Sequence, residues 1–211
     1  MLSIKNVSFK YNNSNSFVFP DISCQAGSQL LILGESGSGK TTLLNILGGL
    51  LAPDKGEVLI DQIPIYSLSG AKLDKFRGNN IGIIFQKPHI LGPLTVEENL
   101  SLANFFVGKK QSDRISQVLE DLGIGQKRRS LVSTLSEGEA QRLSIARALA
   151  NDPKVILADE PTASLDDVNA SKVIQLLKEQ AEKYHAVLII VTHDQRVKDH
   201  FENQTIMGGA L

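Results

Sequence analysis

Residues 30–41 read LLILGESGSGKT, and this stretch decides the fold. Its first four residues form a short apolar run, typical of a strand buried in a parallel sheet. Residues 34–41, which we call the phosphate loop, fit the pattern G-x-x-x-x-G-K-[ST]. Residues 41–51 have helical spacing and stop near Gly48, Gly49 and Pro53. The loop therefore lies between a predicted strand and a predicted helix, which is the context that the pattern requires.

The residue types of the phosphate loop suit the binding of a nucleotide's phosphates. Glycines let the backbone curl so that several N–H groups face one anion, and the following helix adds the positive end of its dipole. The alternative, a glycine-rich turn with a chance lysine, is disfavoured by the flanking elements. We expect Lys40 to reach the β- and γ-phosphates and the Thr41 hydroxyl to bind Mg²⁺. The other predicted phosphate-binding residues are Gly34, Glu35, Ser36, Gly37, Ser38, Gly39 and Thr42.

A second apolar run ends in two carboxylates, at residues 155–160 (VILADE). Ligands of open α/β sheets bind beyond the carboxyl ends of the strands. Asp159 would hold Mg²⁺ through water, and Glu160 would polarise the water that attacks the γ-phosphate. Strand ends also carry acids for structural reasons, so this prediction depends on the phosphate loop upstream.

Further apolar segments at 2–11, 57–61, 81–85 and 187–191 are typical of strands, with helices between several of them. Strands alternating with helices indicate a parallel sheet covered on both faces. Residues 88–135 are mostly helical in pattern, which predicts a helical lobe. Thr95 and Glu98 have capping-box form, and we expect Phe105 and Phe106 to lie in the core of this lobe. The basic run at 127–129 is predicted to be a solvated face.

Composition excludes several classes of protein. The 211 residues are 42% hydrophobic and 21% charged, and 22 Lys+Arg balance 23 Asp+Glu to a formal net charge of -1. No basic excess points to nucleic acid, and no nucleic-acid partner is expected. The single cysteine, Cys24, rules out an internal disulfide framework and a multi-cysteine zinc site. No secretory signal is apparent at residues 1–5, and the longest apolar run, at 186–191, is too short to cross a bilayer.

Further motifs resemble those of ABC ATPases, in the order of that family. Residues 135–142 (LSEGEAQR), here the signature segment, resemble its LSGGQ signature just ahead of the acidic strand. Gln86 matches the family's Q-loop glutamine, and His193 its switch histidine. Residues 164–166 (SLD) match its D-loop, and Tyr11 matches the aromatic residue that stacks on adenine. These motifs extend from Tyr11 to His193, over nearly the whole chain.

The resemblance implies one nucleotide-binding domain over residues 1–211. Its α/β fold would be a P-loop core with a parallel sheet, a small antiparallel β part and an α-helical lobe inserted at roughly 88–140. ATP and Mg²⁺ are the implied cofactors. Catalytic roles fall to Lys40, Gln86, Glu160 and His193, and Mg²⁺ contacts to Thr41, Gln86 and Asp159. Gln86 would also couple the Mg²⁺ site to the helical lobe.

The resemblance also implies partners. Two such domains, as a homodimer or pseudo-dimer, would hold each ATP between one subunit's phosphate loop and the other's signature segment. Ser136 and Gly138 would touch the γ-phosphate bound to the opposite subunit, and Asp166 of the D-loop would lie near it. Closing on ATP and opening after hydrolysis would move a separate integral membrane permease. The chain would thus be peripheral, at the cytoplasmic face of the cell membrane.

Within the family, GESGSGKTTLLNILGGL and NIGIIFQKPHIL followed by PLTVEENL are most similar to the lipoprotein-release, macrolide-export and cell-division ATPases. We therefore expect an ATPase that drives export or lipoprotein release. One alternative is an ATP-driven regulator that signals through a membrane protein without moving a solute. Another is a soluble ABC ATPase of translation or repair. Such proteins carry a second domain or a long coiled coil, and neither fits in 211 residues.

The signature segment departs from the family at Glu137, which replaces the first glycine, and at Glu139, which replaces the glutamine. Ser136 and Glu139 have the form of a capping box, and an acid at Glu137 suits the first turn of a helix. That helix end must also approach an anionic phosphate. Our hypothesis is that the Glu137 side chain points to solvent and leaves closure intact.

We expect Glu137→Gly to change ATP-dependent dimerisation little, because a carboxylate that faces solvent is screened from the phosphate. Size-exclusion chromatography with MgATP measures the dimer fraction. A large gain of dimer in the variant would show that Glu137 had been opposing closure.

Overall fold

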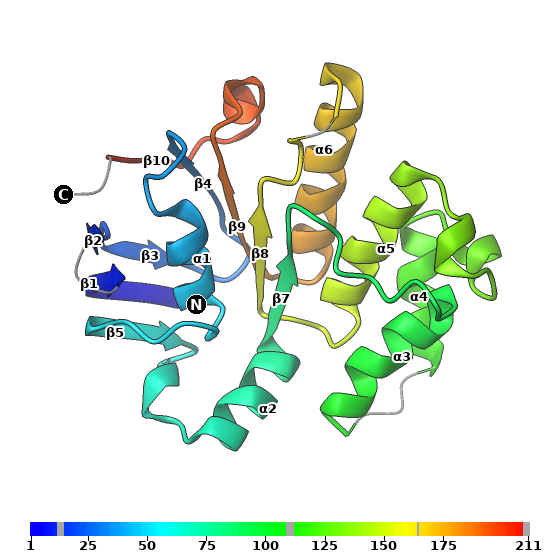
Figure 1. Ribbon diagram of the computed structural model, residues 1–211, viewed down its shortest axis with the longest axis horizontal. Helices are drawn as coiled ribbons and strands as arrows, with labels where there is room; N and C mark the ends of the chain where they lie inside the picture. Colours follow the sequence, from blue (N-terminus) through cyan, green and yellow to red (C-terminus); the bar gives the residue numbers. More distant parts are fainter. Residues whose placement is uncertain (12–14, 109–111, 164, 209–211) are drawn as a thin grey trace.

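The structure is a computed structural model that describes residues 1–11, 15–108, 112–163 and 165–208, in two sheets with surrounding helices (Figure 1). The strands are β1 (Leu2–Tyr11), β2 (Asn15–Val18), β3 (Ile22–Cys24), β4 (Gln29–Gly34), β5 (Lys55–Ile60), β6 (Ile63–Pro64), β7 (Ile81–Ile84), β8 (Val155–Asp159), β9 (Val187–Thr192) and β10 (Gln204–Met207). The α-helices are α1 (Lys40–Leu47), α2 (Gly70–Asn80), α3 (Val96–Phe106), α4 (Ser112–Asp121), α5 (Glu137–Leu149) and α6 (Asp167–Lys183). The 3-10 helices are η1 (Ile65–Ser67), η2 (Gly125–Lys127), η3 (Val132–Thr134) and η4 (Gln195–His200).

The larger sheet is parallel, in the order β10-β4-β9-β8-β7. Every residue of β8 and β9 is buried, as continuous apolar runs predict for strands covered on both faces. The smaller sheet is antiparallel, in the order β2-β1-β5-β6 with β3 also paired to β1. The predicted α/β class, with a parallel sheet and a small antiparallel part, is confirmed. Strand β10 was not predicted, because at the sheet edge it buries only Met207 of its four residues.

The parallel sheet separates two hydrophobic cores. Side chains alternate between the faces of a strand, so Ile156 and Ala158 of β8 join one core while Val155 and Leu157 join the other. The first core contains residues of α3, α4, α5 and α6, and the second contains residues of α1 and the antiparallel sheet. Both faces of β8 are therefore fixed by packing, and its carboxyl end is held firmly in place.

Helices α3, α4 and α5 lie together on one side of the parallel sheet (Figure 1). Their predicted N-terminal caps are confirmed: Thr95 with Glu98, and Ser136 with Glu139, form complete capping boxes. Helix α5 crosses β7 so closely that a Cβ on Gly82 would lie 2.3 Å from the Ala148 carbonyl oxygen. Glycine is therefore needed where this helix meets the sheet.

The prediction that Phe105 and Phe106 pack inside the helical lobe was wrong, since their exposed fractions are 72% and 74%. The buried face of α3 is formed by Val96, Leu100 and Asn104, which repeat every four residues. The two phenylalanines end the helix outside that repeat. They are left as an exposed apolar surface.

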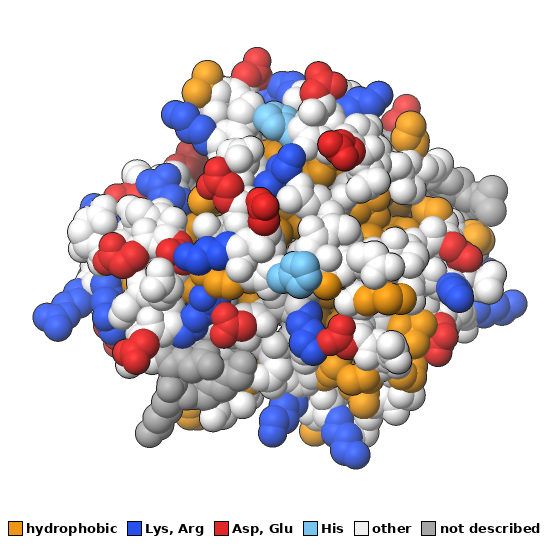
Figure 2. Space-filling view, turned by 180° about the vertical axis from the view of Figure 1, so that it is seen from behind, with side chains coloured by type: hydrophobic (Ala, Val, Ile, Leu, Met, Phe, Trp, Pro, Cys, Tyr) orange, Lys and Arg blue, Asp and Glu red, His pale blue; other side chains and the backbone are white. Residues whose placement is uncertain are grey.

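The outer surface carries charges of both signs, interspersed across the face in Figure 2 as the near-zero net charge predicts. None of the helices in the described part of the chain has both the length and the hydropathy of a membrane-spanning segment.

Candidate functional site

The phosphate loop begins where β4 ends, at Gly34, and ends where α1 begins, at Lys40. Gly39 caps α1 in the left-handed conformation, with φ of 90°. A Cβ at this position would lie 2.5 Å from a ring carbon of Phe17, so both conformation and packing require glycine. No side chain caps the first backbone N–H groups of α1. These donors remain available to an anion seated in the loop.

Lys40 lies inside the phosphate loop, with only 7% of its surface exposed. Its Nζ donates to the carbonyl oxygens of Gly34 at 2.8 Å and Glu35 at 2.9 Å. The same nitrogen lies 3.7 Å from Oε1 of Glu160. The Oγ of Ser38 is buried without a hydrogen-bond partner among the described residues. A buried cation and an unused hydroxyl thus lie where the phosphates are predicted to bind.

The predicted Mg²⁺ residues meet across the sheet. The Thr41 hydroxyl donates to Oδ2 of Asp159 at 2.9 Å, although 118 residues separate the two. Oδ1 of Asp159 is buried and has no hydrogen-bond partner in the described part of the chain. Burial raises the pKa of this carboxyl group, since its ionised form loses hydration. A hydroxyl beside a carboxylate with an unused oxygen fits Mg²⁺, whose remaining ligands would be phosphate oxygens and water.

Glu160 follows Asp159 in a left-handed backbone conformation, with φ of 47°, which a residue with a Cβ adopts only at a cost in energy. Its buried carboxylate accepts from the Thr192 hydroxyl at 2.6 Å and from the His193 backbone N–H at 3.1 Å. Nδ1 of the exposed His193 ring lies 2.8 Å from Oε1 of Glu160. Two predicted catalytic residues are thus in direct contact, and the strained backbone turns the carboxylate toward both.

Tyr11 ends β1 with its ring partly exposed, and its hydroxyl shares a hydrogen bond of 3.2 Å with Thr42. The edge of the Phe9 ring packs on it, with ring centroids 4.7 Å apart. The aromatic face predicted to stack on adenine therefore lies beside the first turn of α1.

The signature segment lies apart from these residues. Ser136 caps α5, and Ser136 and Gly138 are both exposed. Figure 1 places α1 and α5 on opposite sides of β8 and β7. Gln86 is exposed two residues beyond the end of β7. Asp166 is exposed at the N-cap of α6, where it accepts from the Asn169 backbone N–H at 2.9 Å, whereas Ser164 of the D-loop lies outside the described residues.

Ion pairs modify the sequence interpretation of the basic run. Lys127 pairs with Glu139 at 3.2 Å, and Arg128 pairs with Glu97. Both basic side chains keep 35% of their surface exposed and Arg129 is exposed, so the basic run lies at the surface with two of its charges paired. Lys127 lies next to the signature segment because η2 packs against the start of α5 through this pair. Glu137 is exposed, as our hypothesis required.

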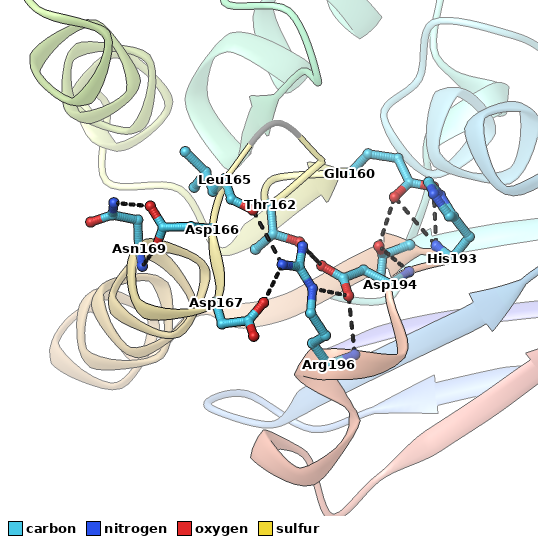
Figure 3. Close-up of polar contacts among 10 residues, drawn as sticks. Glu160, Thr162, Leu165, Asp166, Asp167, Asn169, His193, Asp194 and Arg196 are labelled. Carbon is cyan, nitrogen blue, oxygen red and sulfur yellow. Dashed lines mark hydrogen bonds and ion pairs between the residues drawn. The ribbon is translucent and has the colours of Figure 1, made fainter.

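The sequence interpretation missed several polar residues of the site: Thr162, Thr192, Asp194 and Arg196. Thr162 donates to Asp194 at 2.8 Å, and Asp194 is bound on its other side by Arg196 (Figure 3). The position of Thr192 at the carboxyl end of a buried strand was a usable signal. Arg196 lies in a stretch after His193 whose pattern did not predict any element.

Comparisons with known proteins agree with this geometry. Residues 20–163 match the family model for ABC transporter proteins. The lipoprotein-releasing system ATP-binding protein LolD of Shewanella frigidimarina is 38% identical over 190 residues, which cover 89% of this chain and 80% of that protein.

Two solved structures are similar over nearly the whole chain. The dimeric post-hydrolysis state of the ATP-binding cassette MJ0796, bound to ADP and Pi, has a TM-score of 0.85 at 35% identity and covers 98% of this chain and 94% of its own. CbiO1 of Clostridium perfringens, part of the ABC transporter complex CbiONQ, has a TM-score of 0.88 at 29% identity and covers 100% and 86%.

We expect Lys40→Ala to lose most of the affinity for ATP, because the buried ammonium is the cation that the loop offers to the phosphates. A charge-assisted hydrogen bond contributes about 1.5–3 kcal/mol, so Kd should rise at least about tenfold. Calorimetric titration with MgATP measures it. Lys154→Ala, at the opposite end of β8, is the matched control and should bind normally. Near-normal binding by Lys40→Ala would contradict the predicted role.

Proposed function

Because this chain belongs to the ABC transporter family of ATP-binding proteins, which hydrolyse ATP, we propose that two copies close on ATP and drive a separate membrane permease. One observation carries the proposal. Ser136 and Gly138 are exposed at the start of α5, and Figure 1 draws α5 on the opposite side of β8 and β7 from α1, the helix that the phosphate loop opens. A second copy in head-to-tail arrangement would bring them to the γ-phosphate that they cannot reach in their own chain. The dimeric cassette MJ0796 supports such an assembly.

Within one subunit, the phosphate loop holds the phosphates of ATP, with Lys40 at the β- and γ-phosphates and Tyr11 stacked on adenine. Glu160 orients a water molecule and accepts its proton as the water oxygen attacks the γ-phosphorus and the bond to ADP breaks. His193, already beside Glu160, contacts the γ-phosphate. Thr41 and Asp159 hold Mg²⁺, which when bound neutralises charge on the phosphate oxygens. Gln86 and Asp166 extend this site toward the helical lobe and the second subunit.

A groove of about 920 Å³ between α2, β7 and the C-terminal ends of α3 and α5 is the proposed docking site for the permease. Its apolar lining includes Ile83, Phe85, Phe105 and Phe106. Cationic side chains from α2 and α5 also line it: Lys75, Arg147 and Arg77, of which Arg77 is already paired with Asp74 of the same lining at 2.9 Å. These features suit a cytoplasmic segment of the permease with an apolar face and an acidic side chain. Its docking would hold the subunit at the cytoplasmic face of the membrane.

The proposed cargo of the transporter is drawn from the relatives. Similarity to LolD supports lipoprotein release, or export of a comparable amphipathic cargo, as the work that this ATPase drives. The exposed phenylalanines identify the surface through which force would pass to the permease. Gln86 lies one residue after Phe85 of the groove. The residue proposed to sense the bound nucleotide is therefore adjacent to a residue proposed to contact the permease.

We expect Glu160→Gln to bind MgATP normally and to accumulate as a closed dimer, because the amide keeps the size of the side chain but cannot accept the proton. Loss of general-base catalysis slows hydrolysis by about 10²–10⁴-fold. Phosphate release and light scattering after chromatography measure the two effects. Normal turnover would mean that another residue positions the water. Absence of an ATP-dependent dimer would contradict the proposed closure.

Tagged Glu160→Gln protein with MgATP should retain a polytopic membrane protein from membranes of the source organism, identified by mass spectrometry. Phe106→Glu in the same background should lose it, because a carboxylate on the apolar wall opposes burial of the partner. Val18→Glu changes an equally exposed apolar residue on β2 and should retain it. Recovery of soluble ribosomal or DNA-associated partners alone would refute the transporter role and leave the ATPase chemistry intact.

A further inference from the structure

Arg196 joins two loops that leave neighbouring strands of the parallel sheet. One loop follows β8 and, over its described residues 160–163 and 165–166, leads to α6, and the other follows β9 and leads through His193 to η4. Nε and Nη2 of Arg196 donate to the two oxygens of Asp194, each at 2.8 Å. Nη1 donates to the Leu165 carbonyl oxygen at 3.2 Å and to Asp167 at 2.6 Å (Figure 3). One guanidinium therefore binds the D-loop and the switch-histidine loop at the same time.

The bonds made by Arg196 continue to the catalytic carboxylate. Asp194, which Arg196 holds, accepts from the Thr162 hydroxyl at 2.8 Å. The Asp194 backbone N–H donates to Thr192 Oγ1 at 2.9 Å, and that hydroxyl donates to Glu160 at 2.6 Å. Glu160 is thus connected to Leu165 of the D-loop through Thr192, Asp194 and Arg196. Asp194 bonds to Thr192 with its backbone N–H and to Arg196 with its carboxylate.

Asp194 is ionised in this network. Arg196 lowers the pKa of Asp194 to about 2, so that the carboxylate stays ionised at neutral pH. Asp194 is also the N-cap of η4, where its side chain accepts from the Arg196 backbone N–H at 3.0 Å. The guanidinium is therefore held at one end by the Asp194 carboxylate, whose side chain is 9% exposed, and it presents the other end to the D-loop.

Stability of the monomer accounts for the pair of Arg196 with the largely enclosed Asp194 carboxylate, but not for the arm that reaches Asp167. Arg196 is 42% exposed and Asp167 is 82% exposed, and an ion pair at such positions contributes little to folding. The contacted residues, Leu165 and Asp167, lie on either side of Asp166, the N-cap of α6, which the proposed dimer turns toward the second subunit. A fork of donors that spans two loops is better suited to fix their relative position than to stabilise either one.

We propose that Arg196 is a positioning residue that locks the D-loop to the loop of the switch histidine, so that dimer closure and the placement of Glu160 occur together. This role rests on the proposed dimer function. A displacement of the D-loop on contact with the second subunit would pass through Arg196 and Asp194 to Thr192, and from there to Glu160. ATP binding to a single subunit does not require these bonds, because Lys40, Thr41 and Tyr11 make none of them, although Lys40 lies 3.7 Å from Glu160 at their end.

The test compares Arg196→Ala, Arg196→Lys and Asp167→Asn with the unmodified 211-residue chain. Lys154→Ala, which removes a surface ion pair with Asp61 near the start of β8, is the matched control. Four quantities are measured for each protein: Kd for MgATP, kcat, the dimer fraction with MgATP, and the melting temperature.

For Arg196→Ala we expect unchanged Kd, with kcat lowered at least about tenfold through loss of the bidentate contacts. The melting temperature should fall, because the largely enclosed Asp194 carboxylate loses its cation. Arg196→Lys should recover part of kcat, because an ammonium keeps the charge but cannot bind both loops as a fork. Asp167→Asn, which weakens the D-loop arm alone, should lower kcat by less than Arg196→Ala. Lys154→Ala should match the unmodified chain in all four quantities.

Three outcomes would overturn the proposal. Normal kcat in Arg196→Ala, with Glu160→Gln inactive, would remove the role of Arg196 and leave the proposed function standing. A loss of ATP affinity in Arg196→Ala, with normal kcat in Asp167→Asn, would make Arg196 a structural residue only. If the unmodified chain and Glu160→Gln form no dimer with MgATP, both this role and the proposed function fail.

Discussion

The parallel register of β4, β9 and β8 is the constraint on which the site depends. Leu33 pairs with Thr192, and Asp159 pairs with Val191, so the three strands end in one row. Because these strands are buried on both faces, their ends are fixed by packing rather than by the polar residues beyond them. The phosphate loop starts at this row, Asp159 is the last residue of β8 within it, and Glu160 and the switch histidine follow it directly. Segments more than a hundred residues apart therefore reach hydrogen-bonding distance, as Thr41 and Asp159 do.

The charged residues of the site are shielded from solvent. Lys40, Asp159 and Glu160 are all buried, and burial raises the pKa of Asp159. An ammonium enclosed by carbonyl oxygens and a carboxylate with an unused oxygen form an arrangement that MgATP completes, since its phosphates and cation supply the missing opposite charges. The strained backbone of Glu160 contributes to this arrangement, because the left-handed turn directs its carboxylate at Thr192 and His193.

The division of the ATP site follows from where the helices lie. The phosphate loop opens α1 on one side of the sheet, whereas the signature segment opens α5 on the other (Figure 1). In one copy the two lie apart, so we propose that they meet at one nucleotide only across two copies. The loops after β8 and β9 lie between these parts, and Arg196 connects them. The apolar groove near Phe105 and Phe106 lies at the far ends of α3 and α5, so nucleotide and permease would act on different parts of the same helical lobe.

The sequence alone determined the features that arise from local chemistry. The phosphate loop and both capping boxes are short patterns whose residues contact one another or the adjacent backbone, and the carboxylates of residues 159 and 160 end an apolar run that is visible in the sequence. Tertiary structure decided the rest. The outward position of Phe105 and Phe106 depends on which face of α3 the lobe buries, and the pairing of Lys127 with Glu139 depends on how η2 meets α5. The bonds from Glu160 through Thr192 and Asp194 to Arg196 join loops more than 30 residues apart. No local pattern encodes such contacts, because they exist only after the parallel strands have set their register.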